Sequence, residues 1–227
     1  MSWTKDIWNK SSKIYSAILE LDFLKELAAG TLDSSKFDRY IAQDELYLGI
    51  YGRQMYELAD MITEPEYHDM FLEFAKSGME GEQAMHQLLI GRFGTDLDVK
   101  PSVVTSRYNS HTQKAVDSGM KSLALAAMLP CMWVYNEVGL HILGLSDQKT
   151  NPYAEWISEY GNDEFTQGVN TMLELADKYA DEASEEVRKQ MDEAFLEATL
   201  LELAFWDYGY NGESKNYDYI NSLEEWI

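Results

Sequence analysis

The chain has 227 residues, of which 45% are hydrophobic and 13% aromatic, so it has ample material for a packed core and is too apolar to be disordered. It carries 40 acidic and 18 basic residues, which give a formal net charge of −22. This excess would repel nucleic acid and anionic lipid, so we expect neither as a partner and attribute most of the acidity to solubility.

The chain contains one cysteine, which excludes an intrachain disulfide and suits a reducing compartment. The first residues, MSWTKDIWNK, show no apolar core of a signal peptide. The longest apolar run, residues 123–135, is too short to span a bilayer, and polar residues follow it at once. We therefore expect a cytoplasmic protein that does not associate with membranes.

Helical periodicity extends along nearly the whole chain, and no segment shows the alternation of a β-strand. Gly30 and Gly94 are placed to end helices, and Asp33 is placed to cap the helix that follows it. The tail after residue 211 is polar with interspersed apolar residues, a pattern compatible with a short final helix. In chain order, the predicted helices cover residues 4–29 (one or two helices), 34–62, 65–93, 102–118, 121–146, 152–160, 163–183 and 185–210.

No linker, repeat or low-complexity tract divides residues 1–227. The pattern predicts an all-α multi-helix bundle of about eight to ten helices in a single domain. In a bundle without a sheet, a small ligand binds between facing helices. Polar residues inside apolar helix faces are therefore the places to look for a site.

The predicted helix over residues 34–62 has an apolar stripe with a polar centre. Asp44 occupies the middle of this stripe, and Tyr47 lies one turn further on the same face. A carboxylate directed at a core is strongly destabilising unless it is paired. Two interpretations stay open: a structural acid bonded to a buried tyrosine or a helix end, and a functional acid. The stripe consists of Phe37, Tyr40, Ile41, Leu48, Tyr51, Met55, Leu58 and Ile62.

The stretch AAMLPCMWVYNEVG, residues 126–139, holds the only cysteine, Cys131. Tyr135 follows it by four residues and shares its helix face. Pro130 lies inside the helical run, so we expect a bend beside the thiol. Cys131 can be a small apolar filler or a nucleophile. A nucleophile needs a stabilised thiolate, and Tyr47 on a neighbouring helix is the obvious donor.

The helix predicted over residues 185–210 repeats the pattern of an acid inside an apolar stripe. Glu202 occupies the central place, between Phe195 and Thr199 on one side and Phe205 and Trp206 on the other. One buried acid is often structural. Two acids, each centred in an aromatic-flanked stripe, indicate a shared polar site as readily as two separate structural roles.

Other chemistries find little support. The four histidines form no Glu-x-x-His pair, since the nearest spacings are Glu82 to His86 and Glu137 to His141, so a carboxylate di-iron centre is disfavoured. No Cys/His cluster suits zinc, no serine or histidine has the context of a hydrolase triad, and no glycine-rich phosphate loop is present. We therefore expect no metal and no cofactor.

The stretches that contain these residues resemble the TenA/thiaminase II family, which has the haem-oxygenase-like helical fold. The resemblance covers most of the chain and is strongest over residues 10–210. Each stretch is moderately specific, and their order and spacing strengthen the match. The stretches are GTLDSSKFDRYIAQDELYL, EGEQAMHQLL, YNSHTQKAVDSG, AAMLPCMWVYNEVG, YAEWISEYGNDEF and LELAFWDYGY.

The resemblance implies a role for each residue that matches the family's pattern. It implies that Cys131 is the nucleophile, that Glu202 is the acid/base and that Tyr47 activates the thiol. It also implies that Asp44, Tyr135 and Tyr160 contact the pyrimidine and that Tyr108 and Phe205 line the site. Two departures are the unusually negative charge and the tail after residue 211, which carries no resemblance.

The resemblance also implies a function in thiamin metabolism and salvage. It implies hydrolysis of 4-amino-5-aminomethyl-2-methylpyrimidine to the 5-hydroxymethyl pyrimidine and ammonia, and of thiamin to the hydroxymethyl pyrimidine and a thiazole, by a homotetramer. An alternative is a protein of the same fold that binds the pyrimidine or thiamin without turnover. A haem oxygenase would need a histidine on the first helix, and the first histidine is His68.

Overall fold

A computed structural model of the protein describes residues 2–226, except for the side chains of residues 66, 74, 77–79, 81–83 and 214. The earlier Glu82–His86 pair therefore lies partly outside the described residues. The fold is all-helical, as predicted. The described chain contains α1 (Trp3–Leu19), α2 (Asp22–Ala29), α3 (Ser34–Met61), α4 (Pro65–Phe93), α5 (Val103–Asp117), α6 (Lys121–Leu143), α7 (Ala154–Tyr160), α8 (Asp163–Glu182), α9 (Glu185–Asn211) and the 3₁₀ turns η1 (Gly212–Ser214), η2 (Asp218–Asn221) and η3 (Leu223–Glu225).

The helix ends follow the local chemistry of the sequence. The Asp33 side chain accepts a hydrogen bond from the Ser35 amide and caps α3, as predicted. Gly30 and Gly94 end α2 and α4 with φ values of 70° and 74°, a left-handed conformation that glycine adopts without a Cβ penalty. The predicted helix over residues 121–146 is shorter in the structure, because α6 ends at Leu143.

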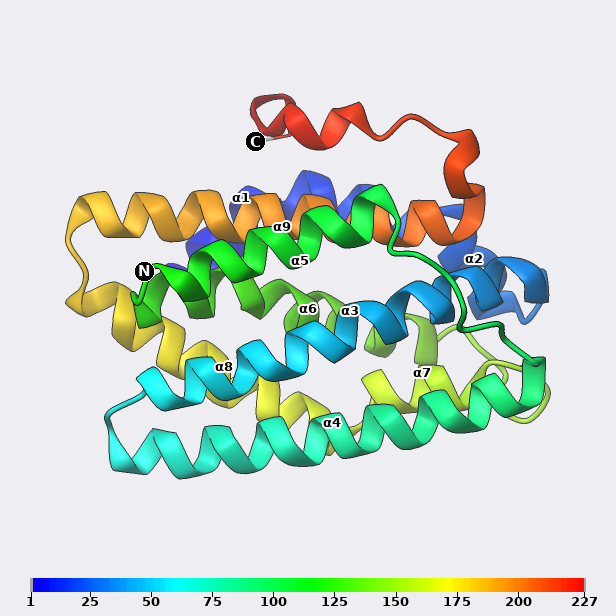
Figure 1. Ribbon diagram of the computed structural model, residues 1–227, viewed down its shortest axis with the longest axis horizontal. Coiled ribbons are helices and arrows are strands. Elements are labelled where there is room, and N and C mark those ends of the chain that lie inside the picture. Colours follow the sequence, from blue (N-terminus) through cyan, green and yellow to red (C-terminus); the bar gives the residue numbers. More distant parts are fainter. Residues whose placement is uncertain (1, 227) are drawn as a thin grey trace.

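Helices α6 and α9 form the centre of the bundle. Helix α6 packs most extensively against α9, and α9 also contacts α1, α3 and α5 (Figure 1). Among the described helices, α6 alone has the length and hydropathy of a membrane span, but 83% of its apolar window is buried inside the protein, as in a core helix. It continues through Pro130 without interruption; the predicted bend stays a prediction.

The tail after α9 forms 3₁₀ turns in place of the expected short helix. Figure 1 shows it running back along the outside of the bundle, beyond α9. Tyr217 and Ile220 are each 5% exposed, so they anchor the tail. Arg107 on α5 donates a hydrogen bond to the Ile220 carbonyl at 3.1 Å, and Lys13 on α1 donates to the Glu225 carbonyl. These contacts attach the tail to α1 and α5.

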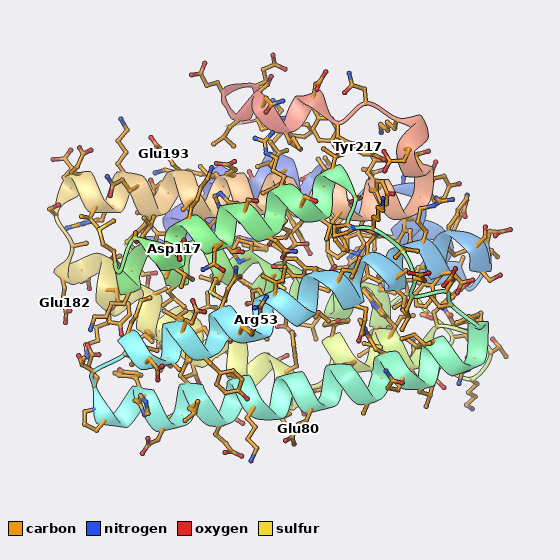
Figure 2. All side chains as sticks on the ribbon, in the orientation of Figure 1. Arg53, Glu80, Asp117, Glu182, Glu193 and Tyr217 are labelled. Carbon is orange, nitrogen blue, oxygen red and sulfur yellow. The ribbon has the colours of Figure 1, made fainter. Side chains whose placement is uncertain are left out.

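The acidic residues that dominate the composition lie on the outside of the bundle. Glu80, Glu182 and Glu193 come from three different helices and are all exposed (Figure 2). Charges in this position are solvated, so they contribute to solubility more than to the fold. The few buried acids are the exceptions that need a partner or a function.

Helix α7 approaches α6 at a glycine. A Cβ atom built on Gly139 would lie 2.6 Å from the Tyr160 carbonyl carbon, closer than any real contact allows. One turn earlier, the Asn136 side-chain amide donates to the Tyr160 carbonyl at 2.9 Å. Gly139 and Asn136 therefore fix the backbone position of Tyr160, a predicted site residue at the C-terminal end of α7.

We expect Gly139→Ala to destabilise the protein by about 1–3 kcal/mol, because the atoms that the new methyl group meets belong to backbone and cannot rotate away. Gly49→Ala is a matched control on α3, since a Cβ atom there meets nothing within 4 Å. That change should stabilise the helix by roughly 0.5–1 kcal/mol. Urea unfolding of both variants tests this, and equal midpoints would show that α7 moves freely relative to α6.

Candidate active site

Eight residues that were expected at the site come from five helices, and none is more than 6% exposed. The structure brings them together in the middle of the bundle. We call this group the central cluster. It consists of Asp44 and Tyr47 on α3, Tyr108 on α5, Cys131 and Tyr135 on α6, Tyr160 on α7, and Glu202 and Phe205 on α9.

Glu202 is a buried acid with one strong hydrogen bond. The Tyr108 hydroxyl donates to Glu202 Oε1 at 2.5 Å. Burial raises the pKa of Glu202 to about 8; the hydrogen bond from Tyr108 opposes the rise, and the charge of Asp44 adds to it. At neutral pH the group is therefore mostly protonated and can donate a proton.

Asp44 lies close to Glu202 and Tyr135, although the three residues belong to three helices. Burial raises the pKa of Tyr135 well above its ordinary value, and Tyr40, Asp44 and Glu202 add to the rise. Asp44 itself is 3% exposed, and its Oδ2 atom is 3.2 Å from Nε2 of His86 on α4. The two acids that interrupt the apolar stripes thus share one site.

Tyr47 and Tyr108 lie beside the thiol. Their ring centroids are 4.7 Å apart. Burial raises the pKa of Tyr47 well above its ordinary value, and the nearby Cys131 and Tyr108 add to the rise. Within the described part of the chain, the buried Tyr47 hydroxyl has no partner at full hydrogen-bond distance, and its interaction with the Tyr108 hydroxyl is weak. Because buried hydroxyls normally have a partner, this one is a donor available to a bound molecule or to the thiolate.

Aromatic rings enclose the acids and the thiol. The ring of Tyr135 is 4.9 Å from that of Tyr160 and 4.6 Å from that of Trp206. The ring of Phe205 is 5.9 Å from that of Tyr47. Such flat apolar walls suit a planar heterocycle and keep water away from the polar groups.

Two polar partners of the central cluster were not expected. Tyr40 counted as an apolar member of its stripe, but its hydroxyl is hydrogen-bonded to that of Tyr135 at 3.1 Å and accepts from the Trp156 indole at 3.3 Å. The sequence does contain one indication of this role: Tyr40 precedes Asp44 by four residues and therefore lies on the same face of α3. His86, which forms no metal-binding pair in the sequence, is fully buried against Asp44.

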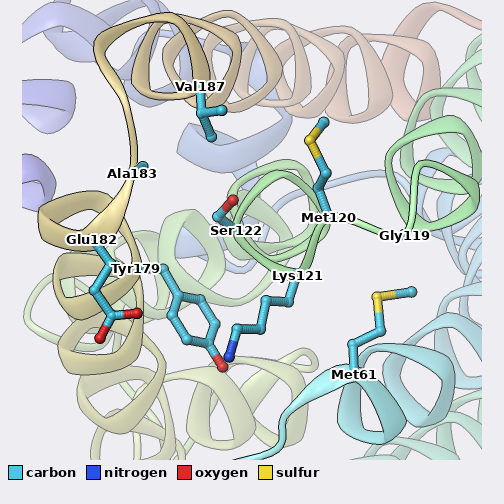
Figure 3. A pocket seen from close by; sticks show the side chains of 9 residues that line it. All are labelled: Met61, Gly119, Met120, Lys121, Ser122, Tyr179, Glu182, Ala183 and Val187. Carbon is cyan, nitrogen blue, oxygen red and sulfur yellow. The ribbon is translucent and has the colours of Figure 1, made fainter.

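A separate surface hollow of about 520 Å³ lies between the ends of α3 and α8 and the start of α6 (Figure 3). Lys121, which lines this hollow, is already paired: its Nζ atom is 2.8 Å from Glu64 Oε1 and 4.5 Å from the centroid of the Tyr179 ring. None of the central-cluster residues lines it. Among the described residues, no three His, Cys, Asp or Glu side chains are grouped as metal ligands.

Curated relatives align with nearly the whole chain. An aminopyrimidine aminohydrolase of Halalkalibacterium halodurans is 28% identical over 224 residues, covering 96% of this chain and 100% of the relative. An aminopyrimidine aminohydrolase of Bacillus subtilis is 31% identical over 211 residues, covering 89% and 87%. A thiamine biosynthesis multifunctional protein of Corynebacterium glutamicum is 31% identical over 90% of this chain, which matches 26% of that longer protein.

Solved structures have the same fold. A TenA homologue from P. horikoshii OT3 superposes with a TM-score of 0.82 at 24% identity, covering 93% of this chain and 100% of that one. A TenA homologue from Pyrococcus furiosus gives a TM-score of 0.86 at 20% identity, with 92% and 100% coverage. The model of the TENA/THI-4/PQQC family matches residues 8–212, which contain the whole central cluster. The chain belongs to the TENA/THI-4/PQQC family.

Proposed function

We propose that the protein is an aminopyrimidine aminohydrolase of the thiaminase II type. It would convert 4-amino-5-aminomethyl-2-methylpyrimidine to the 5-hydroxymethyl pyrimidine and ammonia, and thiamin to the same pyrimidine and a thiazole. The observation that carries the proposal is the shared burial of a thiol, a protonated acid and a second acid among aromatic rings. The names of the curated relatives support it.

Cys131 starts the proposed reaction. Water is a weak nucleophile and an amine is a poor leaving group, so direct displacement is slow. A thiolate that adds to ring carbon 6 breaks the aromaticity, and the electron pair of the N1–C6 π bond moves to N1. Glu202 protonates N1, which makes the ring electrophilic. The raised pKa of Glu202 keeps this proton in place until the addition occurs.

Asp44 acts at the next step. The lone pair of the 4-amino nitrogen forms a C4=N double bond, and the electrons of the C4=C5 π bond form a C5=CH₂ double bond. The group on the methylene departs with the electrons of its own bond, as ammonia from the protonated aminomethyl group or as the neutral thiazole from thiamin. The 4-amino nitrogen gains positive charge, which a carboxylate that accepts its hydrogen bond stabilises. Water then adds to the methylene carbon, the electrons return to the C4=C5 bond and to the 4-amino nitrogen, and the proton that water loses passes to the released ammonia or, with thiamin, to solvent. N1 returns its proton to Glu202 as the thiolate leaves, and aromaticity is restored.

A binding protein without turnover is the second candidate, because the same enclosure would hold a pyrimidine. Incubation with the aminomethyl pyrimidine and with thiamin, followed by chromatography, separates the two. The hydroxymethyl product supports the hydrolase, and saturable binding without product supports the binding protein. A steady-state comparison of both substrates then ranks them.

From the family resemblance we also propose a cytoplasmic homotetramer. Sedimentation velocity of the purified protein tests the assembly: a single species of four times the 26.1 kDa chain mass supports it, and a monomer contradicts it.

Cys131→Ser should fold normally, because the exchange is nearly isosteric, and should lose most turnover, because a hydroxyl is a far weaker nucleophile at neutral pH. Far-UV circular dichroism and thermal unfolding provide the folding control. Activity within about threefold of the wild type would return Cys131 to the role of an apolar filler.

Glu202→Gln should lower kcat by roughly 10²–10⁴, since an amide cannot transfer the proton, and should change KM little, since it still hydrogen-bonds the ring nitrogen. In the wild type, kcat should fall as pH rises through about 8, where Glu202 loses its proton, and the variant should lack this fall. Asp44→Asn is the comparison: it should raise KM and still show the fall in kcat, moved to lower pH because the Asp44 charge no longer raises the pKa of Glu202. A Gln variant with full kcat would assign proton transfer elsewhere.

The same variant should change how stability depends on pH. The folded-state pKa of Glu202 is raised from 4.5 to about 8, so the wild type is most stable below the unfolded value and loses stability as pH rises through the folded value. The Gln variant has no such loss and should exceed the wild type by a few kcal/mol (order of magnitude) at pH 8.5, and by much less at pH 5. Glu193→Gln, exposed on the same helix, is the control in urea unfolding.

A further inference from the structure

His86 connects α4 to two adjacent residues of α3. Its side chain is 1% exposed, and each ring nitrogen contacts a carboxylate oxygen: Nε2 lies 3.2 Å from Asp44 Oδ2 and Nδ1 lies 2.8 Å from Glu45 Oε2. Neighbouring residues of an α-helix project about 100° apart. The imidazole is therefore held from two directions, and neither rotation nor flipping of the ring would preserve both contacts.

The protonation state of the ring follows from its two partners. A neutral imidazole has one N–H donor and one acceptor nitrogen, and the acceptor would face a carboxylate oxygen here. An imidazolium donates from both nitrogens and satisfies both acids. It also provides the positive charge that a buried carboxylate such as Asp44 needs.

Glu45 differs from Asp44 in its access to water. The Glu45 side chain is 35% exposed, whereas that of Asp44 is 4% exposed. The hydrogen bond from His86 lowers the pKa of Glu45 against the effect of burial, so Glu45 is ionised at neutral pH. Glu45 thus anchors the outer nitrogen of the ring and leaves the inner nitrogen directed at Asp44.

We infer that His86, as an imidazolium, is the positioning residue that holds the Asp44 carboxylate ionised and oriented toward the exocyclic amine of an aminopyrimidine. The inference rests on the proposed function for its substrate. The hydrogen bond from Nε2 occupies Oδ2 of Asp44. The other oxygen, Oδ1, is assigned to the exocyclic amine. In this arrangement His86 acts through Asp44.

This arrangement distinguishes the two acids of the central cluster. Glu202 has an uncharged partner, the Tyr108 hydroxyl, and is mostly protonated at neutral pH. Asp44 has a cationic partner, the His86 imidazolium. One site can then hold a proton donor and a hydrogen-bond acceptor of the same chemical type at the same pH, because the neighbours differ.

Two substitutions of His86 separate its two contacts. The side-chain amide of Asn occupies the position of Nδ1, so His86→Asn keeps a donor toward Glu45 and loses the one toward Asp44. The amide of Gln occupies the position of Nε2, so His86→Gln keeps the donor toward Asp44. We expect His86→Asn to lower kcat/KM about 10- to 100-fold, with a raised KM, and His86→Gln to remain at least about fivefold more active.

Both variants are also made in the Asp44→Asn background. If His86 acts through Asp44, the activity difference between the Asn and Gln variants should fall to within about twofold there. A merely structural histidine would retain the difference, because its effect would not depend on the Asp44 charge. Activities are compared well below the lowest melting temperature, so that loss of folded protein does not contribute.

Nitrogen-15 NMR of the wild type provides a readout that does not depend on turnover. The His86 signals, assigned by their loss in the variants, should show both ring nitrogens protonated from pH 6 to 8. A neutral ring overturns the inference, as does equal activity of the Asn and Gln variants. A wild type that neither converts nor binds an aminopyrimidine contradicts the proposed function instead, and the NMR result still decides the charge of His86.

Discussion

Two carboxylic acids close together in a water-poor core cannot both carry an uncompensated charge, and the centre of this protein is organised around that constraint. Asp44 and Glu202 come from helices distant in the sequence, and the charge of Asp44 adds to the rise of the Glu202 pKa that burial causes. Glu202 is neutral at physiological pH because burial disfavours its charged form. Asp44 has a histidine beside it. The chemistry proposed for the site depends on this asymmetry.

The helical scaffold maintains the asymmetry through close backbone approaches and polar anchors. Gly139 lets α7 reach α6, and Asn136 holds the Tyr160 carbonyl where α7 ends. Gly209 has the same use on α9, since a Cβ atom there would lie 3.0 Å from Tyr40 Cβ. Tyr160 and Tyr40 are therefore positioned by close packing against a glycine of a neighbouring helix.

The sequence predicts the helices and much of the candidate site for physical reasons that particular residues illustrate. Asp44 and Glu202 stand out because they interrupt apolar stripes of regular spacing. A buried charge without a partner lowers the free energy of unfolding, so such a residue indicates a partner or a function. Cys131 is different: α6 is buried around most of its circumference, so periodicity does not orient it, and only the family resemblance indicated a nucleophile. Convergence of the residues is described by the structure, whereas their catalytic roles stay predictions.

His86, Tyr40 and the tail escaped the sequence analysis for a common reason. Their partners lie far away in the chain: His86 contacts residues 41 and 42 positions earlier, and Tyr40 is hydrogen-bonded to a residue 95 positions later. Spacing along one helix carries no information about such pairs. The tail turns are likewise held by Arg107 and Lys13, whose carbonyl partners give no signal in a sequence.

The central place of α9 has a consequence for how the chain folds. This helix spans residues 185–211 of 227, yet it contacts α1, α3, α5 and α6, which are all made earlier. During synthesis the apolar faces of these earlier helices therefore stay exposed until α9 is made and covers them. Contacts between residues so distant in the sequence slow folding, and uncovered apolar helices aggregate. The core is therefore complete only once α9 has been made, so a truncation that removes α9 uncovers apolar faces of four other helices.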